Sequence, residues 1–167
     1  PMERGDVIIS PAWTYHDHWN RDTTPAVWID GYDNGYNPNV NINERFPKHN
    51  PYEEVKKPAG YGQRTLGLAR PLSDSAPFPL PPMRYAWADT HAALMALREN
   101  NESDPFDGVM IMLASPVDGG ATLPTIAWQA QLLSKKQKTV AHRHNSTTFY
   151  FAFEGSGVVV IDGERLE

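Results

Sequence analysis

Short apolar runs separated by turn-forming residues dominate the chain. β-Branched and aromatic residues fill these runs, which is typical of the strands of a turn-rich β protein. The pattern predicts strands over residues 7–10, 26–30, 108–116, 125–133 and 158–161. Asp162-Gly163 follows the last run and is a strong hairpin-turn signal, so a return strand should come next. The Arg-Gly-Asp triplet at 4–6 is interpreted as a tight turn before the first strand.

One segment has the composition of a helix. Residues 91–100 (HAALMALREN) are rich in helix formers, and Asn100-Asn101 gives a stop signal. Asp89 or Thr90 can cap the beginning of this helix. Leu94 and Leu97 lie three residues apart, so both should face the same protein surface.

The middle of the chain is rich in asparagine, glycine and proline. Proline fits neither a helix interior nor a central strand, so this part predicts a long irregular connection. The chain therefore divides into a β region (1–31), a connection (32–86), and a helix followed by a second β region (87–167). Both ends of the chain lie within strand patterns, so we expect it to be part of a longer protein.

Composition limits the kind of protein. The formal net charge is −5 and there is no basic block, so nucleic acid is not an expected partner. No apolar run approaches the ~20 residues of a membrane-spanning helix, so we expect a soluble, cytoplasmic protein. The absence of cysteine excludes disulfides and thiolate metal sites. Histidines and carboxylates remain as possible metal ligands.

The most informative stretch is residues 5–20, GDVIISPAWTYHDHWN. His16 and His18 are two residues apart, so on a strand both would point to the same face. Two imidazoles on one face of a β-sheet can bind a metal ion and a substrate together. The alternative is a chance pair of half-exposed histidines.

The spacing in this stretch resembles the second motif of the cupin family. Gly5, Pro11, His16 and Asn20 fit that motif, whereas Trp13 stands in place of its second glycine. The sequence PAWTYHDHWN further resembles that of the ring-cleaving bicupins, which are the gentisate, salicylate and hydroxynaphthoate 1,2-dioxygenases. The resemblance implies an all-β fold of double-stranded β-helix (jelly-roll) type, with partial barrels at 1–31 and 87–167 joined by the long connection.

The same resemblance implies functional roles. His16 would be a ligand of Fe(II), and His18 would stabilise a ring oxygen or bound dioxygen. Asp30 would orient His18 or a substrate hydroxyl, although a strand-end carboxylate capping the turn at Gly31 is an equal alternative. The partners implied are a small aromatic acid such as gentisate, dioxygen, and further copies of the protein in a dimer or tetramer.

A second histidine pair resembles part of the first cupin motif. His142 and His144 supply its H-x-H and would be metal ligands of a second barrel. Lys136 stands where the motif has a glycine, and Thr148 or Phe149 stands where it has its glutamate ligand. The absence of the motif's glycine and glutamate favours a non-catalytic, ligand-binding or structural barrel as the alternative to an enzyme. A further hypothesis joins the two halves, so that His142, His144 and His16 form one three-histidine site.

Overall fold

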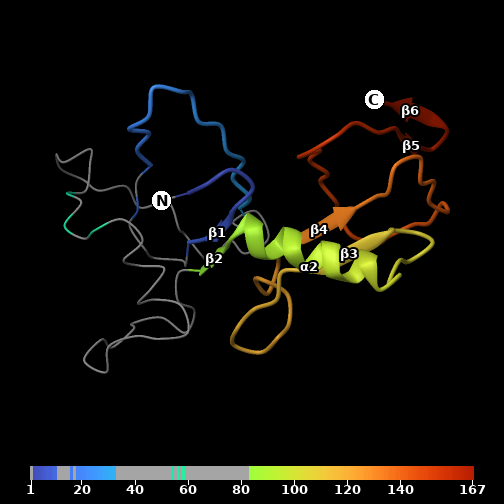
Figure 1. The fold of residues 1–167 in the computed structure, drawn as a ribbon, viewed down its shortest axis with the longest axis horizontal. Helices are drawn as coiled ribbons and strands as arrows, with labels where there is room; N and C mark the ends of the chain where they lie inside the picture. The colour runs from blue at the N-terminus through green and yellow to red at the C-terminus, as the bar shows by residue number, and fades with distance from the viewer. Residues whose placement is uncertain are drawn as a thin grey trace.

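The structure is a computed structural model that describes residues 2–10, 16, 18–32, 54, 56, 58 and 83–167. The described residues form short strands and one helix (Figure 1). In chain order these are β1 (Val7–Ile9), β2 (Met83–Tyr85), α2 (Trp87–Glu99), β3 (Val109–Met112), β4 (Gln129–Leu132), β5 (Val159–Ile161) and β6 (Glu164–Leu166).

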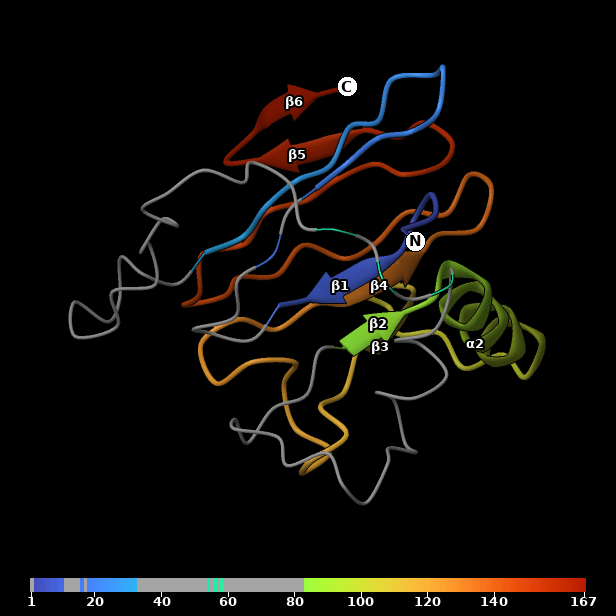
Figure 2. The ribbon, with the colours of Figure 1, turned by 90° about the vertical axis from the view of Figure 1, so that its left-hand side faces the viewer.

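The strands pair into three antiparallel two-stranded sheets. β1 pairs with β2, with Val7 opposite Tyr85; β3 pairs with β4, and β5 with β6. In Figure 2, β5 and β6 lie above the other four strands, and α2 lies to one side. The described residues therefore form a strand-based fold with one helix, as the sequence predicts, and these sheets do not close into a barrel.

Four of the five predicted strands are present, in shortened form. The hairpin at Asp162-Gly163 is also confirmed, because both residues have positive φ (50° and 87°) and β6 follows them. The strand predicted over 26–30 is wrong. Residues 18–32 are exposed and contain no regular strand, since none of the three described sheets pairs with them.

The helix α2 is longer than predicted and begins differently. Its N-cap is Ala86, so the predicted capping role of Asp89 or Thr90 is wrong. Its end is as expected, with Asn100 as the C-cap. Leu94 is buried and Leu97 is half-buried, on the helix that packs against β3 and β4.

Asp6 takes over the capping function from outside the helix. One carboxylate oxygen accepts a hydrogen bond from the backbone N–H of Trp87 (3.0 Å), in the first turn of α2. The other oxygen accepts hydrogen bonds from Arg84 Nε (2.6 Å) and from the N–H of Glu3 (2.8 Å). The side chain of Asp6 is only 1% exposed. A single buried carboxylate thus joins the N-terminal turn, β2 and the helix.

The core is small and lies where the first two sheets meet the helix. Its buried apolar side chains are Ile9, Met83, Leu94, Val109 and Leu113. Tyr85 on β2 also donates a hydrogen bond to the carbonyl of Ala114, just beyond β3 (2.8 Å). The β1–β2 sheet is therefore tied to the β3–β4 hairpin by a polar contact in addition to apolar packing.

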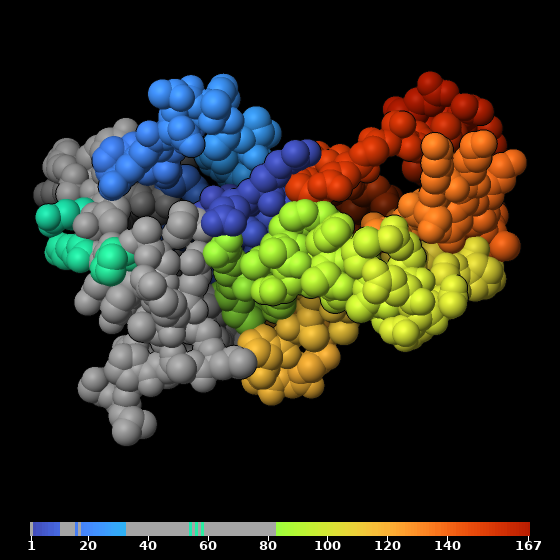
Figure 3. Space-filling view, viewed as in Figure 1, coloured from blue at the N-terminus to red at the C-terminus, as the bar shows by residue number. Residues whose placement is uncertain are grey.

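The C-terminal part is much more open. Residues 139–167 are exposed apart from the half-buried Phe153, and this stretch includes large apolar side chains such as Phe149, Phe151 and Val160. Figure 3 shows its end, coloured red, projecting at the upper right of the molecule. Phe153 nonetheless connects this stretch to the N-terminal turn. Its ring lies 4.9 Å from the guanidinium of Arg4 and packs edge-on against Trp87.

We predict that Asp6→Asn destabilises the protein by about 3 kcal/mol at neutral pH, because it leaves Arg84 without its buried partner. Burial raises the pKa of Asp6. Hydrogen bonds from Arg84, Glu3 and Trp87 and the charge of Arg84 outweigh this, so the pKa lies below its ordinary value.

This lowered pKa fixes the sign of the pH dependence. The stabilisation that the Asp6 carboxylate gives the folded protein is complete above its unfolded-state pKa of about 3.9. It is lost as the pH falls through the pKa of Asp6 in the folded protein. Urea unfolding from pH 7 to pH 3 should show a smaller loss of stability in Asp6→Asn than in the wild type. Equal losses of stability in the two proteins would show that Asp6 is not a source of the pH dependence.

We also predict that Gly5→Ala is more destabilising than Gly155→Ala. Both glycines have positive φ (85° and 79°), so an alanine strains the backbone at either position. A Cβ at Gly5 would also lie 2.7 Å from the ring of Phe153 and 2.8 Å from Trp87, whereas a Cβ at Gly155 meets no atom within 4 Å. Thermal unfolding should therefore show an extra loss of roughly 1–3 kcal/mol for Gly5→Ala. Equal losses would mean that crowding at the turn contributes nothing.

Candidate functional site

The first histidine cluster consists of His16, His18, Trp28, Asp30 and Tyr32. The rings of His16 and His18 meet edge to face, with centroids 5.3 Å apart. His18 also stacks on Trp28, with a centroid distance of 5.0 Å and an interplanar angle of 28°. The sequence predicts both histidines on one face of a strand. Neither His16 nor His18 lies in a strand, so that part of the prediction is wrong, but their rings are in contact.

Asp30 contacts the indole that supports His18. Its carboxylate accepts hydrogen bonds from Trp28 Nε1 (3.3 Å) and from the Tyr32 hydroxyl (3.2 Å). The negative charge of Asp30 is the main cause of a raised pKa at Tyr32, with smaller contributions from burial and the hydrogen bond. Asp30 is thus linked to His18 through the stacked ring of Trp28.

The second histidine cluster consists of Asp107, His142 and His144, with Phe106 beside them. Its base is the turn at 104–108. Asp104 accepts hydrogen bonds from the N–H groups of Phe106 (2.6 Å) and Asp107 (3.0 Å). Gly108 closes the turn with φ 72°, and a Cβ there would lie 2.7 Å from Leu133. The local sequence DPFDG therefore fixes the backbone of Asp107 close to β4.

The histidine segment is attached to this turn. The N–H of Val140 donates to the carbonyl of Pro105 (2.9 Å), and the ring of Phe106 meets His142 edge-on at 5.7 Å. The Nε2 atoms of His142 and His144 lie 2.8 Å apart. Asp107 Oδ1 lies 3.5 Å from His142 Nε2. Two imidazole nitrogens and a carboxylate oxygen therefore gather in a small volume.

A cavity of about 160 Å³ adjoins the second cluster. Asp107 and His144 line it, together with Met110, Gln129, Ser146, Thr148 and Tyr150. Such a cavity can hold several water molecules or a small polar ligand. Its position makes Asp107 and His144 accessible to a ligand from solution.

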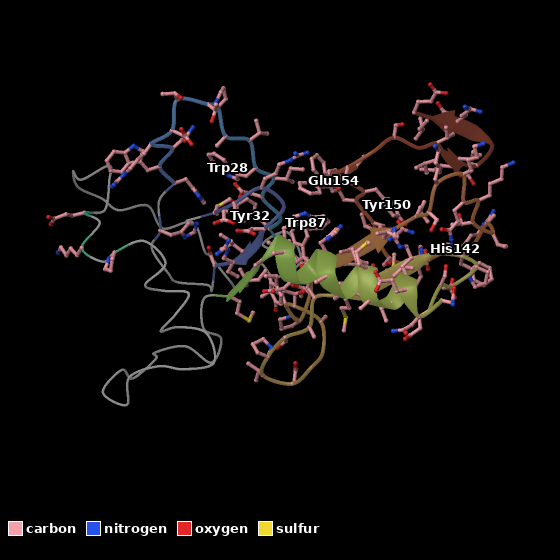
Figure 4. All side chains as sticks on the ribbon, in the orientation of Figure 1. Trp28, Tyr32, Trp87, His142, Tyr150 and Glu154 are labelled. Carbon is pink, nitrogen blue, oxygen red and sulfur yellow. The ribbon has the colours of Figure 1, made fainter. Side chains whose placement is uncertain are left out.

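The two clusters are separate. In Figure 4, His142 and Tyr150 lie well to one side of Trp28 and Tyr32. Among the described residues, no group of three or more His, Cys, Asp or Glu side chains is placed to hold a metal ion. The hypothesis that His16, His142 and His144 form one three-histidine site is therefore wrong for the structure as described.

Sequence reasoning missed several residues of both clusters. Trp28 and Tyr32 stand two residues on either side of Asp30, and this i±2 spacing was an available signal that their side chains could converge on it. Asp107 follows an Asp-Pro turn and gave no such signal. It reaches His142 only because the chain returns 35 residues later.

Comparison with curated proteins shows similarity along nearly the whole chain. The chain is 38% identical to a 5-aminosalicylate 1,2-dioxygenase of Comamonas over 97% of its length, which corresponds to 44% of that protein. It is 34% identical to a gentisate 1,2-dioxygenase of Haloferax over its full length (50% of that protein). It is 30% identical to a 1-hydroxy-2-naphthoate 1,2-dioxygenase of Nocardioides over 99% of its length (43% of that protein).

This chain is a relative of the gentisate-type 1,2-dioxygenases. It spans about half the length of the curated dioxygenases that it matches. No family model matches the chain, and the comparison with solved structures found no match. In the described part of the chain, no helix is long and apolar enough to cross a membrane.

We predict that Asp30→Asn lowers the pKa of Tyr32 toward the ordinary tyrosine value, because it removes the charge that opposes tyrosinate formation. Ultraviolet titration at 295 nm, taken as the difference from Tyr32→Phe, isolates this tyrosine. Asp118→Asn removes a carboxylate from a different loop and should leave the pKa unchanged. A Tyr32 pKa that stays raised in Asp30→Asn would show that the charge of Asp30 is not the cause.

Proposed function

We propose that the full-length protein is a ring-cleaving 1,2-dioxygenase of a small aromatic hydroxy acid. The observation that carries this proposal is the similarity over nearly the entire chain to several enzymes that are all named 1,2-dioxygenases. Their names favour an enzyme over a non-catalytic, ligand-binding barrel.

The substrates in these names share one chemical feature. Gentisate, 5-aminosalicylate and 1-hydroxy-2-naphthoate each carry a carboxylate on the ring carbon next to a hydroxyl-bearing carbon. In the proposed reaction, the bond between these two carbons breaks and both atoms of dioxygen enter the product. The substrate supplies the electrons, so no other reductant is needed. The ortho-hydroxy carboxylate is thus the proposed recognition element, and gentisate is the first substrate to test.

The resemblance to cupin dioxygenases implies Fe(II), and His16 is the proposed ligand in this chain. An imidazole nitrogen is a suitable donor for iron. His16 and His18 alone do not make a complete ligand set, and the described residues near them offer no third donor. Bound Fe(II) would supply electron transfer between the aromatic ring and dioxygen.

The remaining residues of the first cluster have proposed positioning roles. The stack on Trp28 fixes the plane of the His18 ring, while His16 stands at its edge. His18 can therefore present a ring N–H in a defined direction and donate it to a substrate oxygen. Asp30 acts through Trp28, because its hydrogen bond to Nε1 restrains the indole.

The proposed architecture follows the same resemblance. We propose that residues 1–31 and 87–167 belong to two cupin barrels joined by 32–86, and that the protein is a cytoplasmic homo-oligomer. The pairing of β1 with β2 supports close packing between the first region and the end of the connection. The exposed apolar side chains of residues 139–167 would suit burial against further strands of such a barrel.

We predict different losses for the two histidines. The purified protein, loaded anaerobically with Fe(II) and then given gentisate and oxygen, should consume oxygen and form a ring-opened product that absorbs in the near ultraviolet. His16→Ala should lose both iron and turnover. His18→Ala should keep its iron but lose kcat by about 10²–10⁴-fold.

The matched control is His91→Ala, which removes a histidine of α2 outside both clusters and should leave iron and turnover unchanged. Full iron and activity in His16→Ala would refute the ligand assignment. Oxygen consumption that does not respond to any ortho-hydroxy aromatic acid would refute the proposed activity.

A further inference from the structure

We propose that Asp162 is a site of covalent modification, at which the aspartate isomerises through a succinimide ring formed with the backbone nitrogen of Gly163. Asp-Gly pairs stand in the sequence at 30–31, 107–108, 118–119 and 162–163. Glycine favours this ring because it has no Cβ to obstruct the approach of its nitrogen. The structure obstructs the reaction at the first three pairs and leaves it open at the last. The modification does not depend on the proposed dioxygenase activity.

The reaction needs two free groups and no reagent other than water. The nitrogen of Gly163 attacks Cγ of Asp162, a C–N bond forms, and the amide proton and the carboxyl hydroxyl leave as water. Water then adds to one of the two carbonyl carbons of the ring. If the main-chain carbonyl of Asp162 loses its bond to the nitrogen, the chain runs through Cγ and the residue is isoaspartate. If Cγ loses that bond, aspartate is restored. No electrons are transferred, and the mass of the protein is unchanged.

At two of the pairs the attacking nitrogen is held in a hydrogen bond. The N–H of Gly108 donates to the carbonyl of Asp104 (2.8 Å), and the N–H of Gly119 donates to the carbonyl of Ser115 (2.8 Å). Each bond must break before the nitrogen can turn toward the preceding carboxyl group, which slows the reaction. The turns at 104–108 and 115–119 are therefore protected.

At two of the pairs the carboxylate is held as well. Asp30 accepts hydrogen bonds from Trp28 Nε1 (3.3 Å) and the Tyr32 hydroxyl (3.2 Å). Asp118 accepts one from the N–H of Gly120 (3.0 Å), which is the main cause of a lowered pKa at Asp118. An ionised carboxylate has no hydroxyl group to lose, so these bonds also oppose ring formation.

Asp162-Gly163 has neither form of protection. Both residues are exposed. Neither the carboxylate of Asp162 nor the N–H of Gly163 makes a hydrogen bond with another described residue. A Cβ placed at Gly163 would meet no atom within 4 Å, so there is space for the five-membered ring.

The hairpin that carries this pair can also open. Among the described strands, β5 and β6 pair only with each other, over three residues, and all six residues are exposed. An isolated two-stranded hairpin is marginally stable, so its turn samples other backbone conformations, including those needed for attack. If further strands of a barrel covered β5 and β6, their turn would still lie at the end of the strands, where loops stay on the surface.

Isomerisation would change the hairpin itself. The turn has two central residues, both with positive φ (50° and 87°), and it places Ile161 opposite Glu164. Isoaspartate adds one carbon to the backbone of this turn, so the chain can no longer keep the type I′ geometry that sets the register. The modification therefore releases β6 from β5. Hydrogen exchange of the β5 and β6 amides should become faster in the isoaspartate form.

The test compares the folded protein with the same protein unfolded in guanidinium chloride, both incubated at physiological temperature. Peptide mapping with electron-transfer fragmentation locates isoaspartate and gives a rate at each Asp-Gly pair. In the folded protein, Asp162 should react within about twofold of its unfolded rate, because its hairpin opens readily. Asp30, Asp107 and Asp118 should each react about fivefold or more slowly than when unfolded, because hydrogen bonds must break first. Equal protection at all four pairs, or faster reaction at Asp107 or Asp118 than at Asp162, would overturn the proposal.

Two substitutions at the turn test the chemistry. Asp162→Asn keeps a favoured pair for this turn type and loses ammonia in place of water, so it should react faster than the wild type and gain mass. Asp162→Glu would need a six-membered ring and should form no isoaspartate at the turn. Asp118→Glu is the matched control.

A second assay counts the modified sites in the aged proteins. A methyltransferase specific for isoaspartate, supplied with labelled S-adenosylmethionine, should label aged Asp162→Glu far less than aged Asp118→Glu. An Asn34→Gln background is used for this assay, because Asn34-Gly35 can form the same ring with loss of ammonia. Equal labelling of the two variants would refute Asp162 as the site.

Discussion

The buried carboxylate of Asp6 is the interaction on which the arrangement of the described residues depends. It satisfies a free N–H in the first turn of α2, pairs with Arg84 on β2, and closes its own turn through Glu3. A carboxylate at a helix N-terminus also interacts favourably with the helix dipole. Since Ala86 has no side chain that can cap, the helix relies on a residue distant in sequence. The sheet, the helix and the N-terminal turn are therefore held by the same group.

The sequence predicted elements whose signals are local. The Asp162-Gly163 turn, the apolar runs of β3 and β4 and the Asn100 stop of the helix all depend on neighbouring residues. What it missed depends on contacts between distant residues. Asp6 was interpreted only as part of a turn, because Arg84 and Trp87 lie about 80 positions away. The strand expected over 26–30 failed for the converse reason, since a suitable composition does not supply a partner.

The two histidine clusters show the same division. The H-x-H spacing of each pair was visible in the sequence, and each pair does come together. What surrounds a pair was not visible. His18 rests on an aromatic ring held by a carboxylate, whereas His142 faces a carboxylate directly. The first arrangement orients a ring, and the second gathers donor atoms. Identical spacing thus supports different chemistry, depending on which residues the fold brings to it.

The separation of Asp6 from its partners also has a consequence for the order of folding. The hydrogen bond from Arg84 to Asp6 spans 78 residues of sequence, so closing that length of chain costs on the order of 4 kcal/mol of entropy. The β3–β4 and β5–β6 hairpins and α2 are local and can form without this cost. We therefore expect the N-terminal turn to dock late, after the folding transition state. Weakening that contact would then accelerate unfolding and leave the rate of folding almost unchanged.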